Sequence, residues 1–147
     1  MAITARWYTS GTGKLVSGAV DWDGATEIKF MLLGSGYTPD QDAHSTRADL
    51  GANEVTGTNY PAGGWALAGR TVVTHAGTNE TRLDASDVTQ ESLTASWRYG
   101  AVYVARGGAA SADELLGWVD FGQVEDVGPA TVTFQWSASG VLTITAA

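Results

Sequence analysis

Alternation of apolar and polar side chains is the feature that most constrains how this chain can fold. In residues 130–136, Val132, Phe134 and Trp136 alternate with polar residues, and residues 93–104 alternate in a similar way until Gly100, after which the second face is also apolar. A period of two places successive side chains on opposite faces of a β-strand, whereas an α-helix requires a period of about 3.6. The pattern therefore predicts β-sheets that each turn one face toward a core.

Glycine-rich turns separate further segments of the same kind. The segments that we predict as strands are residues 27–33, 54–60, 65–73, 78–83, 93–104, 115–121, 130–136 and 141–145. The last two should form a hairpin across residues 137–140, and residues 84–91 should form a loop. Residues 1–20 leave a short helix or a strand open. Residues 1–147 are thus predicted to be a single all-β domain, an antiparallel β-sandwich or barrel of about eight strands with little helix.

Charge composition limits the partners that the chain can bind. Sixteen acidic residues outnumber eight basic residues, which gives a net charge of −8, and the basic residues are scattered singly. Nucleic acids and anionic membranes both bind clusters of basic residues. Apolar runs such as residues 30–33 are also far too short to span a bilayer. We therefore expect no nucleic-acid partner and no membrane partner.

The residues that could support catalysis form no recognisable motif. The chain has no cysteine, and a Ser-His-Asp triad would have to use His44 or His75 without a G-x-S-x-G motif to supply the nucleophile. Asp21 and Asp23 could form an acid/base pair in a sugar site, but two turn carboxylates explain them with fewer assumptions. We therefore predict that the chain is not an enzyme and has no cofactor and no small-molecule substrate.

Residues 37–52 are predicted to form an irregular loop. Within it, Asp40, Asp42 and His44 alternate, and they could hold a divalent cation if the segment were extended. The glycine and the final glutamate of a calcium loop are missing, however, and a turn built by Asx side chains around Pro39 explains the same residues. We favour the turn and predict no metal site, with cation binding as the open alternative.

Several segments together resemble a family of small phage virion proteins that are often encoded among head and tail genes. The resemblance spans nearly the whole chain and is carried by VDWD (20–23), IK (28–29), LL (32–33), YTPDQDAH (37–44), NEV (53–55), GT (57–58), Tyr60, GG (63–64), LDA (83–85), YGAV (99–102), GWVDFG (117–122) and FQW (134–136). Trp118 stands where the family would have Tyr. The family is structural, so the resemblance implies no catalytic residues.

The resemblance implies a non-enzymatic structural protein of the virion, made in the host cytoplasm. Its partners would be the major capsid protein and copies of itself, and it would decorate the outer capsid surface as a homo-oligomer, commonly a trimer. A short, acidic chain without a repetitive shaft favours this placement over a tail or fibre component. Residues 1–8 also lack the basic and apolar regions of a secretory signal.

Subunit contacts are predicted in the N-terminal segment, in the irregular loop and at one tryptophan. The candidate interface residues are Arg6, Trp7 and Tyr8 in a possible docking arm at residues 1–18, Tyr37 and Pro39 in the loop at residues 37–52, and Trp65. Trp97 and Trp136 are expected in the core. Deletion of residues 1–8 is expected to abolish capsid binding and to leave the fold intact. A carbohydrate-binding module, with several tryptophans on one exposed face, is the alternative of another class.

Overall fold

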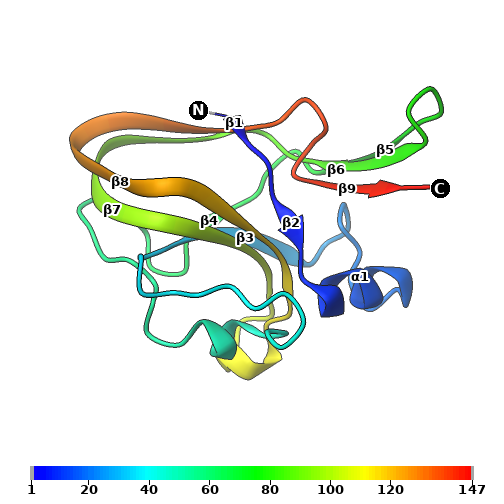
Figure 1. Ribbon diagram of the computed structural model, residues 1–147, viewed down its shortest axis with the longest axis horizontal. Coiled ribbons are helices and arrows are strands. Elements are labelled where there is room, and N and C mark those ends of the chain that lie inside the picture. Colours follow the sequence, from blue (N-terminus) through cyan, green and yellow to red (C-terminus); the bar gives the residue numbers. More distant parts are fainter. Residues whose placement is uncertain (1, 147) are drawn as a thin grey trace.

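The computed structural model describes residues 2–146 (Figure 1), so Met1 and Ala147 of the predicted domain lie outside the described residues. The strands (β), the α-helix and the 3-10 helices (η) are, in chain order, β1 (Ala2–Ile3), β2 (Arg6–Trp7), α1 (Thr9–Val16), β3 (Glu27–Leu33), η1 (Arg47–Leu50), β4 (Trp65–Ala66), β5 (Thr71–His75), β6 (Glu80–Asp84), β7 (Val88–Ala105), η2 (Ala110–Ala112), β8 (Leu115–Trp136) and β9 (Leu142–Thr145). Strands dominate, which confirms the prediction of a mostly β chain with little helix. They form a mixed six-stranded sheet and an antiparallel three-stranded sheet, and these do not close into a barrel.

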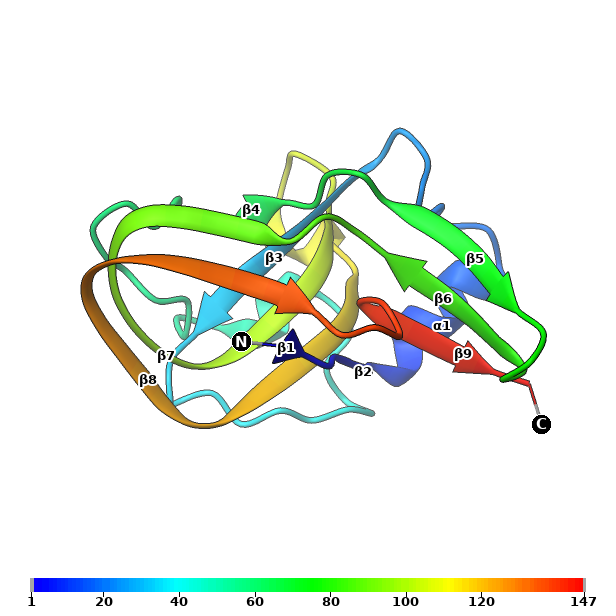
Figure 2. The same cartoon turned by 90° about the horizontal axis from the view of Figure 1, so that it is seen from above.

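A long hairpin of β7 and β8 is the framework of the domain. The two strands, of 18 and 22 residues, pair antiparallel and bend back, so that the two halves of the hairpin lie one above the other (Figures 1 and 2). Their register shifts at several points between Gln90 and Tyr99, and Gly122 of β8 has a φ of 82°. Irregularities of this kind bend a strand and increase its twist. β2 and β3 extend the half of the hairpin next to its connection at residues 106–114, and β1 extends the half that contains the other ends of the two strands.

Aromatic side chains fill the space between the two halves. The ring centroid of Phe30 in β3 lies 5.5 Å from that of Phe134 and 5.1 Å from that of Trp136, both in edge-to-face geometry. Trp97 and Trp136 are both buried, which confirms their predicted core position. Alternate residues of β3, such as Met31, point from its other face into a second buried cluster, which also contains Tyr8, Tyr37 and Leu50. Both faces of β3 are therefore covered, which explains why this strand reads as a nearly continuous apolar run.

Several predicted elements are wrong. Alternation shows which face of a segment is apolar, but it shows neither where a bent strand ends nor which strand lies beside it. Residues 115–121 and 130–136 belong to one strand, β8, and the predicted loop at residues 84–91 contains the start of β7. Residues 54–60 make isolated bridges rather than a strand. β9 pairs with β6, so the predicted hairpin between residues 130–136 and 141–145 is replaced by a connection between two sheets.

Residues 2–16, predicted as part of a docking arm, are built into the fold. β1 pairs in parallel with the end of β8, β2 pairs antiparallel with its beginning, and α1 packs against the same strand. Ile3 and Tyr8 are buried. Deletion of residues 1–8 would remove both side chains from the core, which contradicts the prediction that this deletion leaves the fold intact. A docking role for the segment stays a prediction.

Candidate interaction surface

β5, β6 and β9 form a small sheet that projects from the body of the domain, and we call it the wing sheet (Figures 1 and 2). Gly69, with a φ of 61°, interrupts the predicted strand at residues 65–73, so that β4 stays with the main sheet and β5 enters the wing. Directly opposite residues of antiparallel strands share one face. The register therefore puts two rows of side chains on one face: an inner row of Val72, Leu83 and Leu142, and an outer row of Thr74, Thr81 and Ile144.

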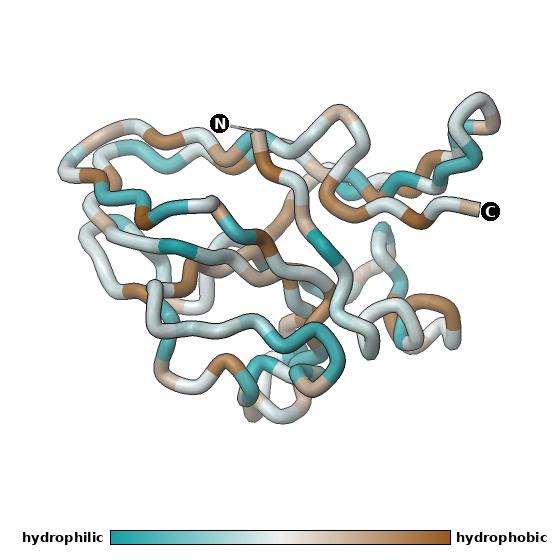
Figure 3. Tube along the Cα trace, viewed as in Figure 1, coloured by the Kyte–Doolittle hydropathy of each residue, from teal (hydrophilic) through white to brown (hydrophobic). Residues whose placement is uncertain are grey.

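This face is covered at its inner end and open at its outer end. Leu83 and Leu142 are each 1 % exposed and belong to the main core. Val72, in the same row but on the edge strand β5, is 45 % exposed, and Ile144, in the outer row, is 36 % exposed. Figure 3 shows hydrophobic residues along the wing sheet and at the end of α1, where Val16 is 83 % exposed. Apolar side chains therefore continue from the core onto the surface of the molecule.

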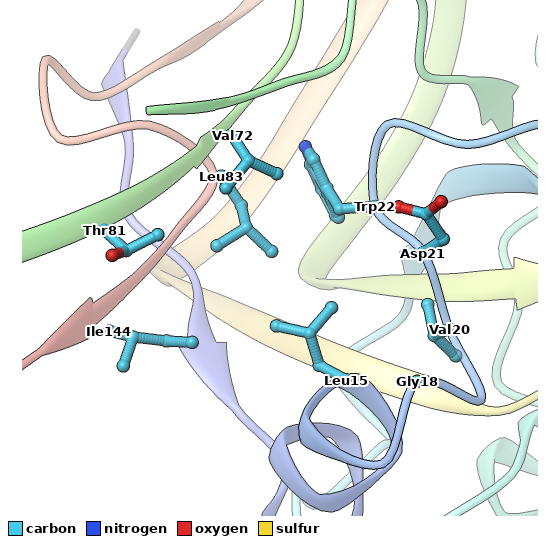
Figure 4. Close-up of a pocket in the computed structure, with 9 residues that line it drawn as sticks. All are labelled: Leu15, Gly18, Val20, Asp21, Trp22, Val72, Thr81, Leu83 and Ile144. Atoms are coloured by element: carbon cyan, nitrogen blue, oxygen red, sulfur yellow. The ribbon is translucent and has the colours of Figure 1, made fainter. Parts of the chain in front are cut away.

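A pocket of about 380 Å³ lies between the wing sheet, the end of α1 and the segment that follows α1 (Figure 4). Its lining is Leu15, Gly18, Val20, Asp21, Trp22, Val72, Thr81, Leu83 and Ile144. In Figure 4 the side chains of Leu15, Leu83 and Ile144 point toward one another across the pocket. Asp21 supplies the one charged group of the lining, so the pocket is suited to apolar side chains of a protein partner.

A second hollow continues the first toward the tip of the wing. Its volume is about 290 Å³, and it shares Thr81 and Ile144 with the first pocket. It ends at the turn between β5 and β6, beside His75 and Asn79. The apolar face is therefore hollowed along most of its length, from the core to the tip.

Two indole groups hold the wing sheet to the body of the domain. Trp22 donates its N–H to the carbonyl oxygen of Asp84 at 2.9 Å, at the end of β6. Trp7 of β2 donates its N–H to the carbonyl oxygen of Thr143 in β9, also at 2.9 Å. Trp7 is one of the predicted interface residues, and within this chain its half-buried ring positions the wing.

Gly11 brings α1 into close contact with β8 and so places the end of the helix beside the pocket. A Cβ atom added to Gly11 would lie 2.6 Å from the carbonyl oxygen of Leu116, which is too close for any other residue without movement of the helix. Gly13, in the same helix, has nothing within 4 Å of the corresponding position. The close approach at Gly11 therefore sets the position from which Leu15 reaches the pocket.

β5 forms one edge of the wing sheet, and the side of β5 that faces away from β6 is unpaired within residues 2–146. Within residues 2–146, β5 pairs only with β6, and Thr71–His75 contain no carboxylate, lysine, arginine or proline. Val73 points to the face opposite the pocket and is 46 % exposed. The bent part of β8 also has a free edge, but it carries Glu125, Asp126 and Pro129. Charges and proline are the means by which natural edge strands prevent pairing with other chains, and β5 lacks them.

The remaining predicted interface residues, Arg6, Trp65 and Pro39, lie in three different segments of the chain. The guanidinium of Arg6 lies over the ring of Trp118, with its carbon 5.2 Å from the ring centroid. Trp65 is half-buried, stacks on Phe30 and donates its N–H to a side chain of β7. Pro39 is half-buried in its loop. All six tryptophans are buried or half-buried, so they form no exposed row of the kind that the sugar-binding alternative requires.

Tyr8 and Tyr37, also predicted as interface residues, are buried and bonded to each other, with their hydroxyl oxygens 2.6 Å apart. The Tyr37 hydroxyl lies 2.9 Å from Nδ1 of His44, and the backbone N–H of Asp40 points to the same nitrogen. Because an N–H can only donate, Nδ1 is the acceptor; Tyr37 donates to it, and Tyr8 donates to Tyr37. Burial raises the pKa of both tyrosines. Their side chains thus stabilise the second cluster and are not available to a partner.

Asp40, Asp42 and His44 lie in a turn. The carboxylate of Asp40 accepts hydrogen bonds from the backbone N–H groups of Ala43 at 2.9 Å and Asp42 at 3.1 Å, and these bonds hold its pKa below the usual range. Asp42 accepts a hydrogen bond from Thr9 at the start of α1. This is the Asx turn that the sequence favours over a cation loop. In the part of the chain that the structure describes, no group of three or more His, Cys, Asp or Glu side chains is placed to hold a metal ion.

Comparison of the chain with protein-family models, with curated proteins and with solved structures finds no match. Among residues 2–146, no helix combines the length and the hydrophobicity that crossing a bilayer requires. Apart from Asp21, which was considered as part of a sugar site, sequence reasoning missed the pocket residues and the β5 edge. The available signal for the β5 edge was the uncharged run at residues 71–75. Without knowledge of the break at Gly69, this run looks like the end of a longer buried strand.

Proposed function

We propose that this chain is a non-enzymatic structural protein of a phage virion that works by binding other protein subunits. In its most specific form, the proposal is a decoration protein that binds the outer capsid surface as an oligomer and stabilises the head. Its partners are the major capsid protein and copies of itself. The resemblance of residues 20–136 to small phage virion proteins supports the virion part, and the sandwich-like bend of the β7–β8 hairpin provides the compact β domain that such a cap needs.

The observation that carries the protein-binding part is the open outer half of the apolar face of the wing sheet. Val72 and Ile144 reach solvent at the rim of a pocket lined mainly by carbon atoms, and the exposed Val16 follows the pocket residue Leu15 at the end of α1. Contiguous exposed apolar surface on a soluble chain typically marks a contact with another protein. Full burial of one valine or isoleucine side chain contributes about 1.5–3 kcal/mol, so covering these three side chains would stabilise a subunit contact appreciably.

Repetition makes such a contact sufficient for a capsid. A single wing offers a small surface, which by itself gives weak binding. On a symmetric shell the same contact occurs many times, and linked copies bind with a high effective concentration. The proposed mechanism is therefore burial of the wing face against neighbouring subunits, multiplied by the symmetry of the particle.

Locating the chain in an imaged virion tests the proposal directly. Density on the outer capsid surface, at a copy number comparable to that of the major capsid protein, is the result that we expect. Density in a tail tube or fibre would support a structural role but contradict the decoration role. Purified particles that lack the chain would contradict both.

Substitutions in the wing test the surface itself. Val16→Glu and Ile144→Glu should each weaken binding to capsids that lack this protein by at least about tenfold, which corresponds to 1.4 kcal/mol of lost contact energy. Val124→Glu is the matched control, because Val124 is 49 % exposed but lies on β8, away from the pocket. Co-sedimentation of each variant with capsids measures the effect. Equal loss in all three variants would remove the wing face from the proposal.

A further inference from the structure

The edge of β5 offers a pairing surface that the pocket does not use. The backbone groups of Thr71–His75 that face away from β6 have no partner strand within residues 2–146. A row of unpaired N–H and C=O groups is a template for a strand of another chain. The lack of charge and proline on β5, in contrast to the bent part of β8, indicates that pairing at this edge is permitted.

We propose that β5 pairs antiparallel with β5 of a second copy of this chain, about a two-fold axis that passes through Val73. The inference deepens the proposed function, on which its biological role rests, by naming the surface through which copies associate. The two wings would then form one continuous sheet, in the order β9-β6-β5-β5-β6-β9.

The register of this pairing follows from the symmetry. A two-fold axis perpendicular to the sheet keeps each face of one wing continuous with the same face of the other. Val73 then lies opposite Val73 of the second copy, Val72 lies opposite Thr74, and Thr71 lies opposite His75. Val72 and Val73 are 45 % and 46 % exposed on opposite faces, so the pairing covers an apolar side chain on each face.

The lack of charge on β5 makes this edge suitable for a second copy of the chain. Two copies that each carry a net charge of −8 repel each other unless the surfaces that meet are uncharged. β5 contains one titratable group, His75, and the carboxylate opposite it, Glu80, is held 2.8 Å from the guanidinium of Arg82. A partner that recognises acidic residues would find no carboxylate on this strand, whereas an identical strand meets it without adding charge repulsion at the contact itself.

The dimer is expected to be weak because β5 is short. A strand of five residues contributes few ladder hydrogen bonds and a small buried area. Association should therefore depend on protein concentration in the range where weak complexes form. On a capsid surface the high local concentration of copies would favour the same pairing.

A charge at the two-fold axis provides the first test. Val73→Glu places two carboxylates opposite each other in the dimer, while in the single chain the new side chain lies beside Arg82, so the fold is retained. Val124→Glu adds the same charge on β8 and is the control. In sedimentation velocity over a concentration series, the unchanged chain and Val124→Glu should approach twice the monomer mass, and Val73→Glu should remain monomeric. A monomer at all concentrations, or a trimer that Val73→Glu does not change, would overturn the inference.

A crosslink provides the second test, and it does not depend on disrupting a contact. The chain has no cysteine, so Val73→Cys introduces a single thiol. Opposite side chains of an antiparallel pair have Cβ atoms about 4.5–5.5 Å apart, which is close to the spacing in a disulfide. Mild oxidation should convert Val73→Cys to a covalent dimer much faster than it converts the control, Val124→Cys. Equal rates for the two variants would contradict the pairing.

Capsid binding separates the failure of this inference from the failure of the proposed function. If Val73→Glu abolishes the dimer and the unchanged chain binds no capsid, self-pairing stands and the virion role fails. If the unchanged chain binds capsids and Val73→Glu still dimerises, the virion role stands and the β5 pairing fails.

Discussion

Tyr8 and Tyr37 show that the loss of stability caused by removing a hydroxyl group depends on the direction of its hydrogen bonds. The chain of bonds runs from Tyr8 to Tyr37 and on to His44. Tyr37→Phe would leave the fully buried Tyr8 hydroxyl without an acceptor, which costs about 1–3 kcal/mol. Tyr8→Phe removes a donor but leaves Tyr37 bonded to His44, so it should cost only about 1 kcal/mol. Urea unfolding of the two variants measures the difference, and a Tyr8→Phe effect equal to or larger than that of Tyr37→Phe would contradict the assigned direction.

The same two residues show what a single sequence leaves open at this scale. Both are aromatic residues outside any clear strand, a setting that predicts interface anchors as readily as core residues. Burial of Tyr8 depends on Tyr37, which is 29 residues away in the chain, and on the loop that contains Tyr37. Trp97 and Trp136 were predictable as core because each lies within an alternating segment whose apolar face is defined by its neighbours.

At the scale of the element, α1 contains a matched pair of glycines. Gly11→Ala should destabilise the protein by about 1–3 kcal/mol, because the added methyl group would clash with the backbone of β8 and force the helix to move. Gly13→Ala should stabilise it by about 0.5–1 kcal/mol, because alanine has the higher helix propensity and nothing lies near the added atom. Thermal unfolding of both variants compares them. A destabilising Gly13→Ala would show that the conformation of α1, rather than its approach to β8, limits substitution.

The strands show which part of the fold the sequence encodes locally. β3 was predictable with its boundaries, because its apolar run ends at a glycine turn. β8 was not, because Gly122, Gly128 and Pro129 look like turn residues but lie within one bent strand. β9 was assigned to the wrong partner for a related reason, since residues 137–140 do make a tight turn, with a bridge from Ser137 to Gly140. After that turn the chain enters the wing sheet instead of pairing back.

At the scale of the whole molecule, the candidate interaction surface lay beyond single-sequence prediction because it is assembled from four separate parts of the chain: α1 with the segment after it, β5, β6 and β9. Leu15, Leu83 and Ile144 each have an ordinary core-like sequence context. Whether such a residue ends in the core or at the open end of a sheet depends on how far α1 covers the wing. The composition, in contrast, showed directly that the chain is acidic, with sixteen acidic residues against eight basic residues.

Net charge and the proposed dimer contact act in opposite directions, and salt separates them. Raising the ionic strength from about 0.01 M to about 0.15 M shortens the Debye length from about 30 Å to about 8 Å, which screens the repulsion between two acidic copies. Because the β5 contact contains no ion pair, screening should strengthen it, and the dissociation constant of the dimer should fall several-fold. Sedimentation equilibrium at the two ionic strengths measures this change. Val124→Glu, with one more negative charge per copy, should respond more steeply, and a dissociation constant that rises with salt would mean that ion pairs hold the copies together.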